Sequence, residues 1–292
     1  MIKTVLIIIG FFIHYYSFCQ NDTTLKLIPN WKKGEIKKYE IKNYISVDAE
    51  NERKVNDLTT KVIVLQVTDV KDNELAMNWR VEELYFSDTI NQDNPFSGLV
   101  NSLDKDISVE YIIDKNGNVI DISNLDEITK TIKTKVDNAL KEFIDKNKIE
   151  KSKADMLSFQ FTMMYSTPEQ IKTFVLSDIS RFHQIYGFSY TFNKITIIPD
   201  NVFAPNAGGQ PSNNLLLKLT RSIDSQIISL TGKLECAESN EKLREFVEKD
   251  RSVIYEYKVQ LPEYWLISNK STLKSNSGYV NVNTTYEITM IE

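Results

Sequence analysis

The run from Asp114 to Asp121 is the first stretch whose residue types could do chemistry, because oxygen-bearing side chains recur along it. A calcium-binding loop of the EF-hand type supplies such ligands, but it needs glycine at its sixth position and a bidentate glutamate at its twelfth. Here the glycine, Gly117, is fourth and the twelfth residue is Leu125. Strand-forming residues flank the run, so the pattern favours a hairpin turn with Gly117 at a positive φ over a metal site.

Catalytic side chains are scarce. Downstream of residue 19 the chain has one histidine, His183, and one cysteine, Cys236. A catalytic triad would also need a nucleophile and an orienting carboxylate within reach, and no Gly-x-Ser-x-Gly motif occurs. Glu82 and Glu83 are neighbours on an expected strand, so they point to opposite faces, whereas a glycosidase directs two carboxylates at one bond. We therefore expect no catalytic residue, no metal ligand and no cofactor, and a structural or surface role for His183.

An apolar cavity is the remaining candidate site, because methionine and aromatic residues are concentrated in one expected strand and in the expected helices. Methionine side chains adapt to varied apolar ligands, and ligand pockets are mostly apolar. The predicted lining of such a cavity is Met77, Trp79, Phe161, Met164 and Phe174. A packed core would use the same residue types, so both interpretations stay open.

The first 19 residues indicate export. Lys3 precedes an unbroken apolar run from Val5 to Ile13, which is shorter than the roughly 20 residues that a membrane-spanning helix needs. The segment fits a signal peptide over residues 1–19, with cleavage after Cys19. The alternative is a lipoprotein with lipid attached to Cys19, for which the preceding Phe18 is larger than the small residue expected there.

The composition favours a folded globular chain. With 40 acidic and 35 basic residues the net charge is −5, which argues against nucleic acid as a partner. Hydrophobic residues make up 41%, and 9 Gly and 7 Pro are too few for a fibrous or linker-rich chain. We expect one exported domain over residues 20–292, with no transmembrane segment in the mature chain.

Strands are expected on both sides of a helical middle. Residues 75–82 alternate between apolar and polar, which predicts a half-buried strand. Residues 60–70 are apolar at both parities, which predicts a strand covered on both faces. The alternation over residues 280–290 predicts that the last strand closes a sheet. Short polar connections between these segments favour antiparallel hairpins.

Three helices are expected between residues 124 and 187. Apolar residues three to four apart predict a helix over 124–148, and a shorter one is expected over 153–165. Thr167, Pro168 and Gln170 form an N-terminal capping pattern, and Gly187 predicts the end of that third helix. Strands over 31–122, helices over 124–187 and strands over 190–291 predict an α+β fold: a large curved antiparallel sheet with a central helical insertion packed on one face.

Two turn-and-strand phrases carry a resemblance. They are WKKGEIKKY at residues 31–39 and VEYIIDKNGNV at residues 109–119, and a closing strand follows Trp265. With the signal peptide, they resemble an uncharacterised family of exported proteins from Gram-negative bacteria. That resemblance implies the periplasm or the cell surface and supplies no catalytic residue. In architecture the expected fold is also similar to the envelope lipid carriers, in which a curved antiparallel sheet wraps helices.

The sequence thus favours a non-enzymatic envelope protein that binds a lipid or another apolar ligand, or an envelope protein partner. The alternative is a structural or assembly-accessory module that acts through its sheet edges. A carboxylate-based hydrolase ranks third.

Overall fold

The computed structural model describes residues 24–49, 55–87, 103, 105–199, 213–221, 226–236, 251–276 and 280–292. The signal peptide expected over residues 1–19 lies outside the described residues. The same holds for most of the Pro/Gly-rich segment over 204–214, for which the sequence predicts a loop, and for residues 240–250, for which it predicts a short helix.

The described strands form one open antiparallel sheet of 11 strands and one small pair. The order in the large sheet is β6-β5-β4-β3-β2-β13-β12-β11-β10-β9-β8, and β1 pairs with β7. The strands are β1 (Thr24–Lys26), β2 (Ile36–Ala49), β3 (Val55–Lys71), β4 (Glu74–Phe86), β5 (Ser108–Asp114), β6 (Val119–Ile122), β7 (Ser189–Thr191), β8 (Ile195–Pro199), β9 (Asn213–Arg221), β10 (Ile227–Cys236), β11 (Arg251–Gln260), β12 (Trp265–Asn276) and β13 (Val280–Met290).

The large sheet consists of two meanders joined at its centre. Strands β2 to β6 pair in chain order, as do β8 to β13, and the last strand pairs with β2 from Tyr39–Met290 to Ala49–Val280. The predicted closing strand therefore lies in the middle of the sheet. The helices α4 (Leu125–Asn147), α5 (Lys151–Tyr165) and α6 (Pro168–His183) lie between the two meanders in the chain.

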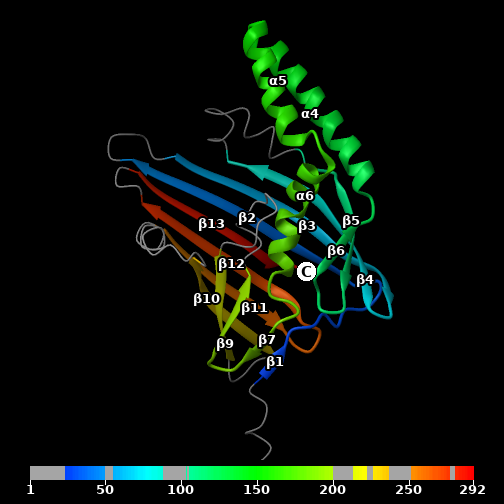
Figure 1. The fold of residues 1–292 in the computed structure, drawn as a ribbon, viewed down its shortest axis with the longest axis vertical. Helices are drawn as coiled ribbons and strands as arrows, with labels where there is room; N and C mark the ends of the chain where they lie inside the picture. The colour runs from blue at the N-terminus through cyan, green and yellow to red at the C-terminus, as the bar shows by residue number, and fades with distance from the viewer. Residues whose placement is uncertain are drawn as a thin grey trace, which may run out of the picture.

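The sheet curves around α6. This helix contacts β2 and β4 through Phe182, whose ring centroid lies 5.2 Å from that of Tyr39 and 5.9 Å from that of Trp79. It also contacts β13, because the Tyr286 hydroxyl donates to Asp178 Oδ1 over 2.9 Å. Strands from both meanders therefore face one helix, and Figure 1 shows α6 in front of the sheet with α4 and α5 extending beyond it.

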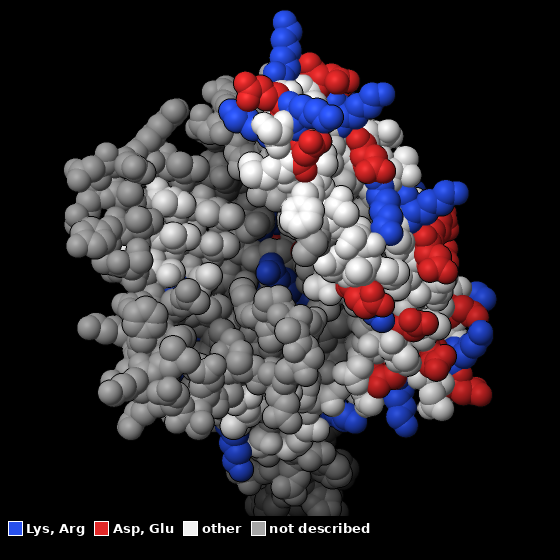
Figure 2. Space-filling model, turned by 45° about the horizontal axis from the view of Figure 1, so that its top comes forward, with Lys and Arg blue, Asp and Glu red and all other residues white. Residues whose placement is uncertain are grey.

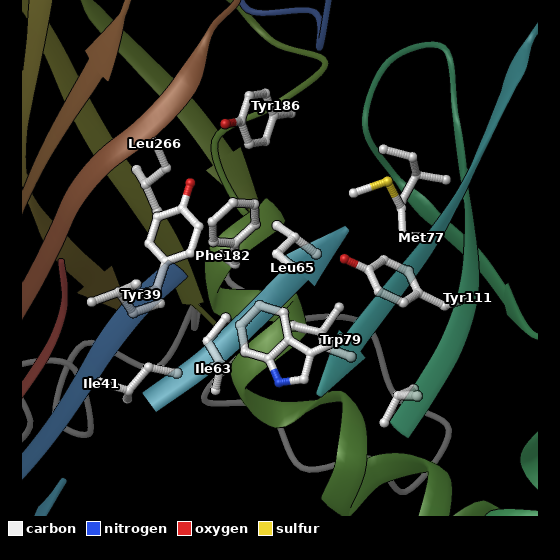
Figure 3. Close-up of a cluster of buried hydrophobic side chains, with 14 of the residues drawn as sticks. Tyr39, Ile41, Ile63, Leu65, Met77, Trp79, Tyr111, Phe182, Tyr186 and Leu266 are labelled. Carbon is white, nitrogen blue, oxygen red and sulfur yellow. The ribbon is translucent and has the colours of Figure 1, made fainter. Parts of the chain in front are cut away.

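The inner face of the sheet and α6 enclose an aromatic core. In Figure 3, Phe182 projects from α6 among Tyr39, Leu65, Trp79 and Leu266, which come from four strands. Each of these side chains is buried. Burial of large apolar side chains, each worth about 1.5–3 kcal/mol, is the main force that holds the helix on the sheet.

The outer face of the sheet carries a row of alternating charges across four strands. Glu256, Lys270, Glu287 and Lys42 lie directly opposite one another across β11, β12, β13 and β2. Such cross-strand pairs of opposite charge contribute about 0.2–1 kcal/mol each. An antiparallel sheet with one face in the core and the other towards solvent shows this alternation.

The strand expected to be covered on both faces has one face in the core. Ile63 and Leu65 on β3 are fully buried, whereas Val62 and Val64 are half-buried on the outer face. The prediction of two covered faces is wrong, because β-branched residues favour a strand through their χ1 restriction as well as through burial.

Candidate functional site

Four side chains form a polar cluster between α6 and the inner face of the sheet: Lys61, Asp178, Arg181 and Tyr286. Lys61 Nζ lies 3.1 Å from Asp178 Oδ2, with side-chain exposures of 20% and 16%. The Tyr286 hydroxyl donates to the other carboxylate oxygen over 2.9 Å. The Arg181 guanidinium carbon lies 4.1 Å from the centroid of the Tyr286 ring, a cation–π distance.

The local sequence explains why these polar groups lie inside. On β3, Lys61 has the same parity as the buried Ile63 and Leu65, so its stem points to the inner face. On α6, Asp178 lies four residues after Phe174 and seven after Ile171, so it falls on the apolar stripe of the helix. Two charged residues are thereby directed at each other across the helix–sheet interface.

The charges of the cluster determine its protonation. Burial raises the pKa of Asp178, but the charges of Lys61 and Arg181 and the hydrogen bond from Tyr286 outweigh it, so the pKa lies below its usual value. Burial and the nearby Asp178 carboxylate raise the pKa of the Tyr286 hydroxyl. Near neutral pH Asp178 is therefore ionised and the Tyr286 phenol is neutral.

A small pocket adjoins the cluster on its β4–β5 side. Its cavity volume is about 30 Å³, room for one or two water molecules. The lining residues are Lys61, Trp79, Val81, Ile107, Val109, Phe174, Val175, Ser177 and Asp178. Figure 2 shows a hollow near the centre of its view, with Lys or Arg atoms visible inside it.

Half-buried apolar side chains continue the inner face on the other side of the cluster. We call Ile45, Val47, Leu273 and Val282 the inner strip; all four are half-buried. Val47 and Val282 are directly opposite, and Thr284 lies between Ile45 and Leu273. The inner strip lies on the same face as the buried Tyr39 and Ile41, because the pairing of β2 with β13 has no bulge there.

The structure brings together two of the five residues predicted to line an apolar cavity. Trp79 and Phe174 line the same pocket. Met77, on the same strand as Trp79, is 1% exposed within the core. Phe161 and Met164 belong to α5, and their side chains lie outside the described residues.

His183 is part of the core. Its Nε2 lies 3.0 Å from the Tyr111 hydroxyl, and its ring packs against Trp31, Phe182 and Tyr186. Burial lowers the pKa of His183 to about 3, against the effect of a backbone hydrogen bond with Gly117. A histidine in this setting is neutral at physiological pH.

The run from Asp114 to Asp121 forms the predicted hairpin. Asp114 Oδ1 accepts hydrogen bonds from the backbone N–H groups of Asn116 and Asn118 over 2.8 and 2.9 Å. Gly117 has φ +89°, and β5 and β6 pair antiparallel on either side. The Asp114 carboxylate is thus a turn-stabilising acceptor.

The polar cluster was not among the sites predicted from the sequence. Its signal was a charged residue at an apolar position: Lys61 in the alternation of β3 and Asp178 in the stripe of α6. Across the described residues, no group of three or more His, Cys, Asp and Glu side chains is arranged to hold a metal ion. No helix in the same part of the chain is long and apolar enough to cross a membrane.

No protein-family model and no curated protein matches this chain. Lipovitellin, in a structure described for its lipid–protein interactions, is similar with 8% sequence identity and a TM-score of 0.49. That match covers 89% of this chain and 25% of lipovitellin, so the chain spans about a quarter of that protein. DynF of the dynemicin biosynthesis pathway of Micromonospora chersina matches with 5% identity and a TM-score of 0.18, over 92% of this chain and 86% of DynF. Neither likeness is strong enough to carry over a function.

Proposed function

We propose that this protein is an exported, non-enzymatic binding protein of the Gram-negative envelope that holds an apolar ligand on the concave face of its sheet. The ligand would lie along the inner strip, next to the polar cluster. The apolar leader over residues 1–19 supports the exported location.

The inner strip is the observation that supports this site best. Along β2, the inward side chains pass from fully buried at Tyr39 and Ile41 to half-buried at Ile45 and Val47. Because the side chains of the strip are only half-buried, part of their apolar surface is exposed. A ligand that covered this surface would gain about 25 cal/mol for each Å² removed from water. Concave apolar surface with a few polar groups beside it is typical of a ligand site.

The packed core makes a large cavity at the predicted position less favourable. Met77 is fully buried, and the pocket at Trp79 and Phe174 holds about 30 Å³, the volume of one or two water molecules. An alkyl chain would need the pocket to widen through movement of Phe174, which is half-buried. We therefore place the ligand on the inner strip.

A fluorescent fatty acid titrated into the purified protein tests this proposal. We expect saturable binding, and we expect Leu273→Glu to abolish it because a carboxylate on the inner strip is costly to bury beside an alkyl chain. Thr272→Glu is the matched control, since Thr272 is the half-buried neighbour that points to the outer face. Equal binding by both variants, at equal thermal stability, would contradict the proposed site.

The alternative function, a module that acts through its sheet edges, has its own support. Ile120 on β6 is 51% exposed, and Ile195 and Ile197 on β8 are 64% and 62% exposed. These strands are the two edges of the large sheet, and exposed apolar edges favour pairing with another chain. Association with a protein that Ile195→Lys abolishes and Leu273→Glu preserves would favour this alternative.

A hydrolase is less well supported. Asp178 is the carboxylate that lines the pocket, and its pKa is lowered rather than raised. A general acid needs a raised pKa, so an ionised Asp178 suits charge balance better than proton donation.

A further inference from the structure

We infer that the ligand is an amphiphile whose headgroup is uncharged and carries hydroxyl groups, and that Thr59, Asn43 and Ser271 bind this headgroup. The alkyl chain of the ligand lies on the inner strip. This inference rests on the proposed function and names the class of ligand for the same site.

The three side chains belong to one row of inward positions across the sheet. Thr59, Asn43, Tyr286 and Ser271 lie directly opposite one another on β3, β2, β13 and β12. Thr59 and Ser271 are each 7% exposed, and Asn43 is half-buried. The Tyr286 hydroxyl already donates to Asp178. We call the other three residues the neutral row.

The neutral row has hydrogen-bonding groups that the protein does not use. Among the residues that the structure describes, none of its three side chains has a hydrogen-bond partner. In the same part of the chain Asn269 Oδ1, on the same face of β12 as Ser271, is buried and lacks a donor. Unpaired polar groups at buried positions are costly. A ligand hydroxyl can both donate to and accept from such groups, whereas an ester or a carboxylate can only accept.

The formal charges beside the neutral row sum to zero without a ligand. On β3, Lys61 and Asp57 are the inward positions on either side of Thr59. On α6, Asp178 and Arg181 contact Tyr286. These are two positive and two negative residues, so a charged headgroup would add an unbalanced ion to a partly buried site, which is costly. An uncharged headgroup carries no such cost.

The order of side chains along the strands gives the ligand its direction. On β2, Ile45 and Val47 follow Asn43 on the same face, and on β12 Leu273 follows Ser271. A strand rises about 3.3 Å per residue, so the apolar surface of β2 extends roughly 13 Å beyond the neutral row. A headgroup at the row and an alkyl chain along the inner strip match this order on both strands.

The test compares four probes on the purified protein: monodecanoylglycerol, methyl decanoate, decanoate and glycerol. The first two share the acyl chain and the ester group, and the first adds two hydroxyl groups. We expect monodecanoylglycerol to bind about tenfold more tightly than methyl decanoate, as two hydrogen bonds between neutral groups would give. Decanoate should bind no more tightly than the methyl ester, and glycerol too weakly to compete.

Variants of the neutral row locate the headgroup. Thr59→Val and Ser271→Ala each remove a hydroxyl group with little change of shape. Together they should abolish the preference for monodecanoylglycerol and leave the affinity for methyl decanoate unchanged. Thr60→Val is the matched control, because Thr60 is the half-buried neighbour of Thr59 on the outer face of β3, and it should keep the preference.

Each outcome decides a separate point. Equal affinity of the wild type for monodecanoylglycerol and methyl decanoate would overturn the hydroxyl-bearing headgroup and leave the apolar site standing, and tightest binding of decanoate would overturn the uncharged headgroup. Binding of none of the acyl probes would overturn the proposed function itself. Glycerol that binds as tightly as monodecanoylglycerol would replace the amphiphile with a free polyol. A preference that persists in the double variant, at unchanged melting temperature, would show that the headgroup lies elsewhere.

Discussion

At the scale of single residues, Gly117 and Gly34 share a backbone conformation in different surroundings, with φ +89° and +87°. A Cβ at Gly117 would lie 2.6 Å from the Tyr186 Cβ and 3.0 Å from Pro29 Cγ, and at Gly34 it would meet nothing within 4 Å. We expect Gly117→Ala to lower the free energy of unfolding by about 2–4 kcal/mol through strain and overpacking. Gly34→Ala should cost about 1–2 kcal/mol through strain alone. Equal losses in chemical denaturation would contradict tight packing of the β5–β6 turn on Tyr186.

His183 makes stability depend on pH. Burial lowers its pKa in the folded protein to about 3, whereas the unfolded chain has a value of about 6.5. The unfolded state therefore binds the proton more readily, so the stability that neutral His183 supports is complete above about pH 6.5 and is lost as the pH falls towards 3.

We expect this loss to disappear in His183→Gln, which cannot titrate. Between about pH 6 and pH 4 the free energy of unfolding of the wild type should fall by up to about 1.4 kcal/mol more per pH unit than that of the variant. Urea denaturation over this range measures the difference. Parallel pH profiles would mean that His183 is not neutral in the folded protein.

At the scale of elements, α6 is the helix that the sheet surrounds, and its N-terminus follows the predicted capping box. Gln170 N donates to Thr167 Oγ1 over 3.2 Å, and Thr167 N donates to Gln170 Oε1 over 3.0 Å. We expect Thr167→Ala to lower the free energy of unfolding by about 1 kcal/mol. Thr173→Ala, in the exposed middle of the same helix, should change it by less than about 0.5 kcal/mol. Thermal denaturation of both variants decides this, and similar effects would contradict the capping role.

Local signals predicted the elements well and their ends less well. The third helix was expected to reach Gly187, and it ends at His183. The reason is that Gly187 N donates to Leu27 O over 2.8 Å, so a contact with the segment before β2 replaces a helical hydrogen bond.

The sequence of β12 lacks the apolar alternation that identifies a half-buried strand. Its inward positions include three polar residues, Asn269, Ser271 and Ser275.

At the scale of the whole molecule, the sequence predicted antiparallel hairpins but not the pairing of β2 with β13 that joins the two meanders. That pairing depends on contacts between the two ends of the chain, which local pattern does not encode. The polar cluster was missed for the same reason. Lys61 and Asp178 are separated by 117 positions, and the packing of α6 on the inner face of the sheet brings them together.

The central claim is that an apolar ligand lies on the concave face, along the inner strip. Photo-crosslinking of the purified protein with a diazirine-bearing fatty acid, followed by peptide mapping, tests it most directly. We expect labelling of β2, β12 and β13 at or beside Ile45, Val47, Leu273 and Val282, and competition by unlabelled fatty acid. Labelling confined to the outer face or to α5, or labelling that unlabelled fatty acid does not reduce, would contradict the claim.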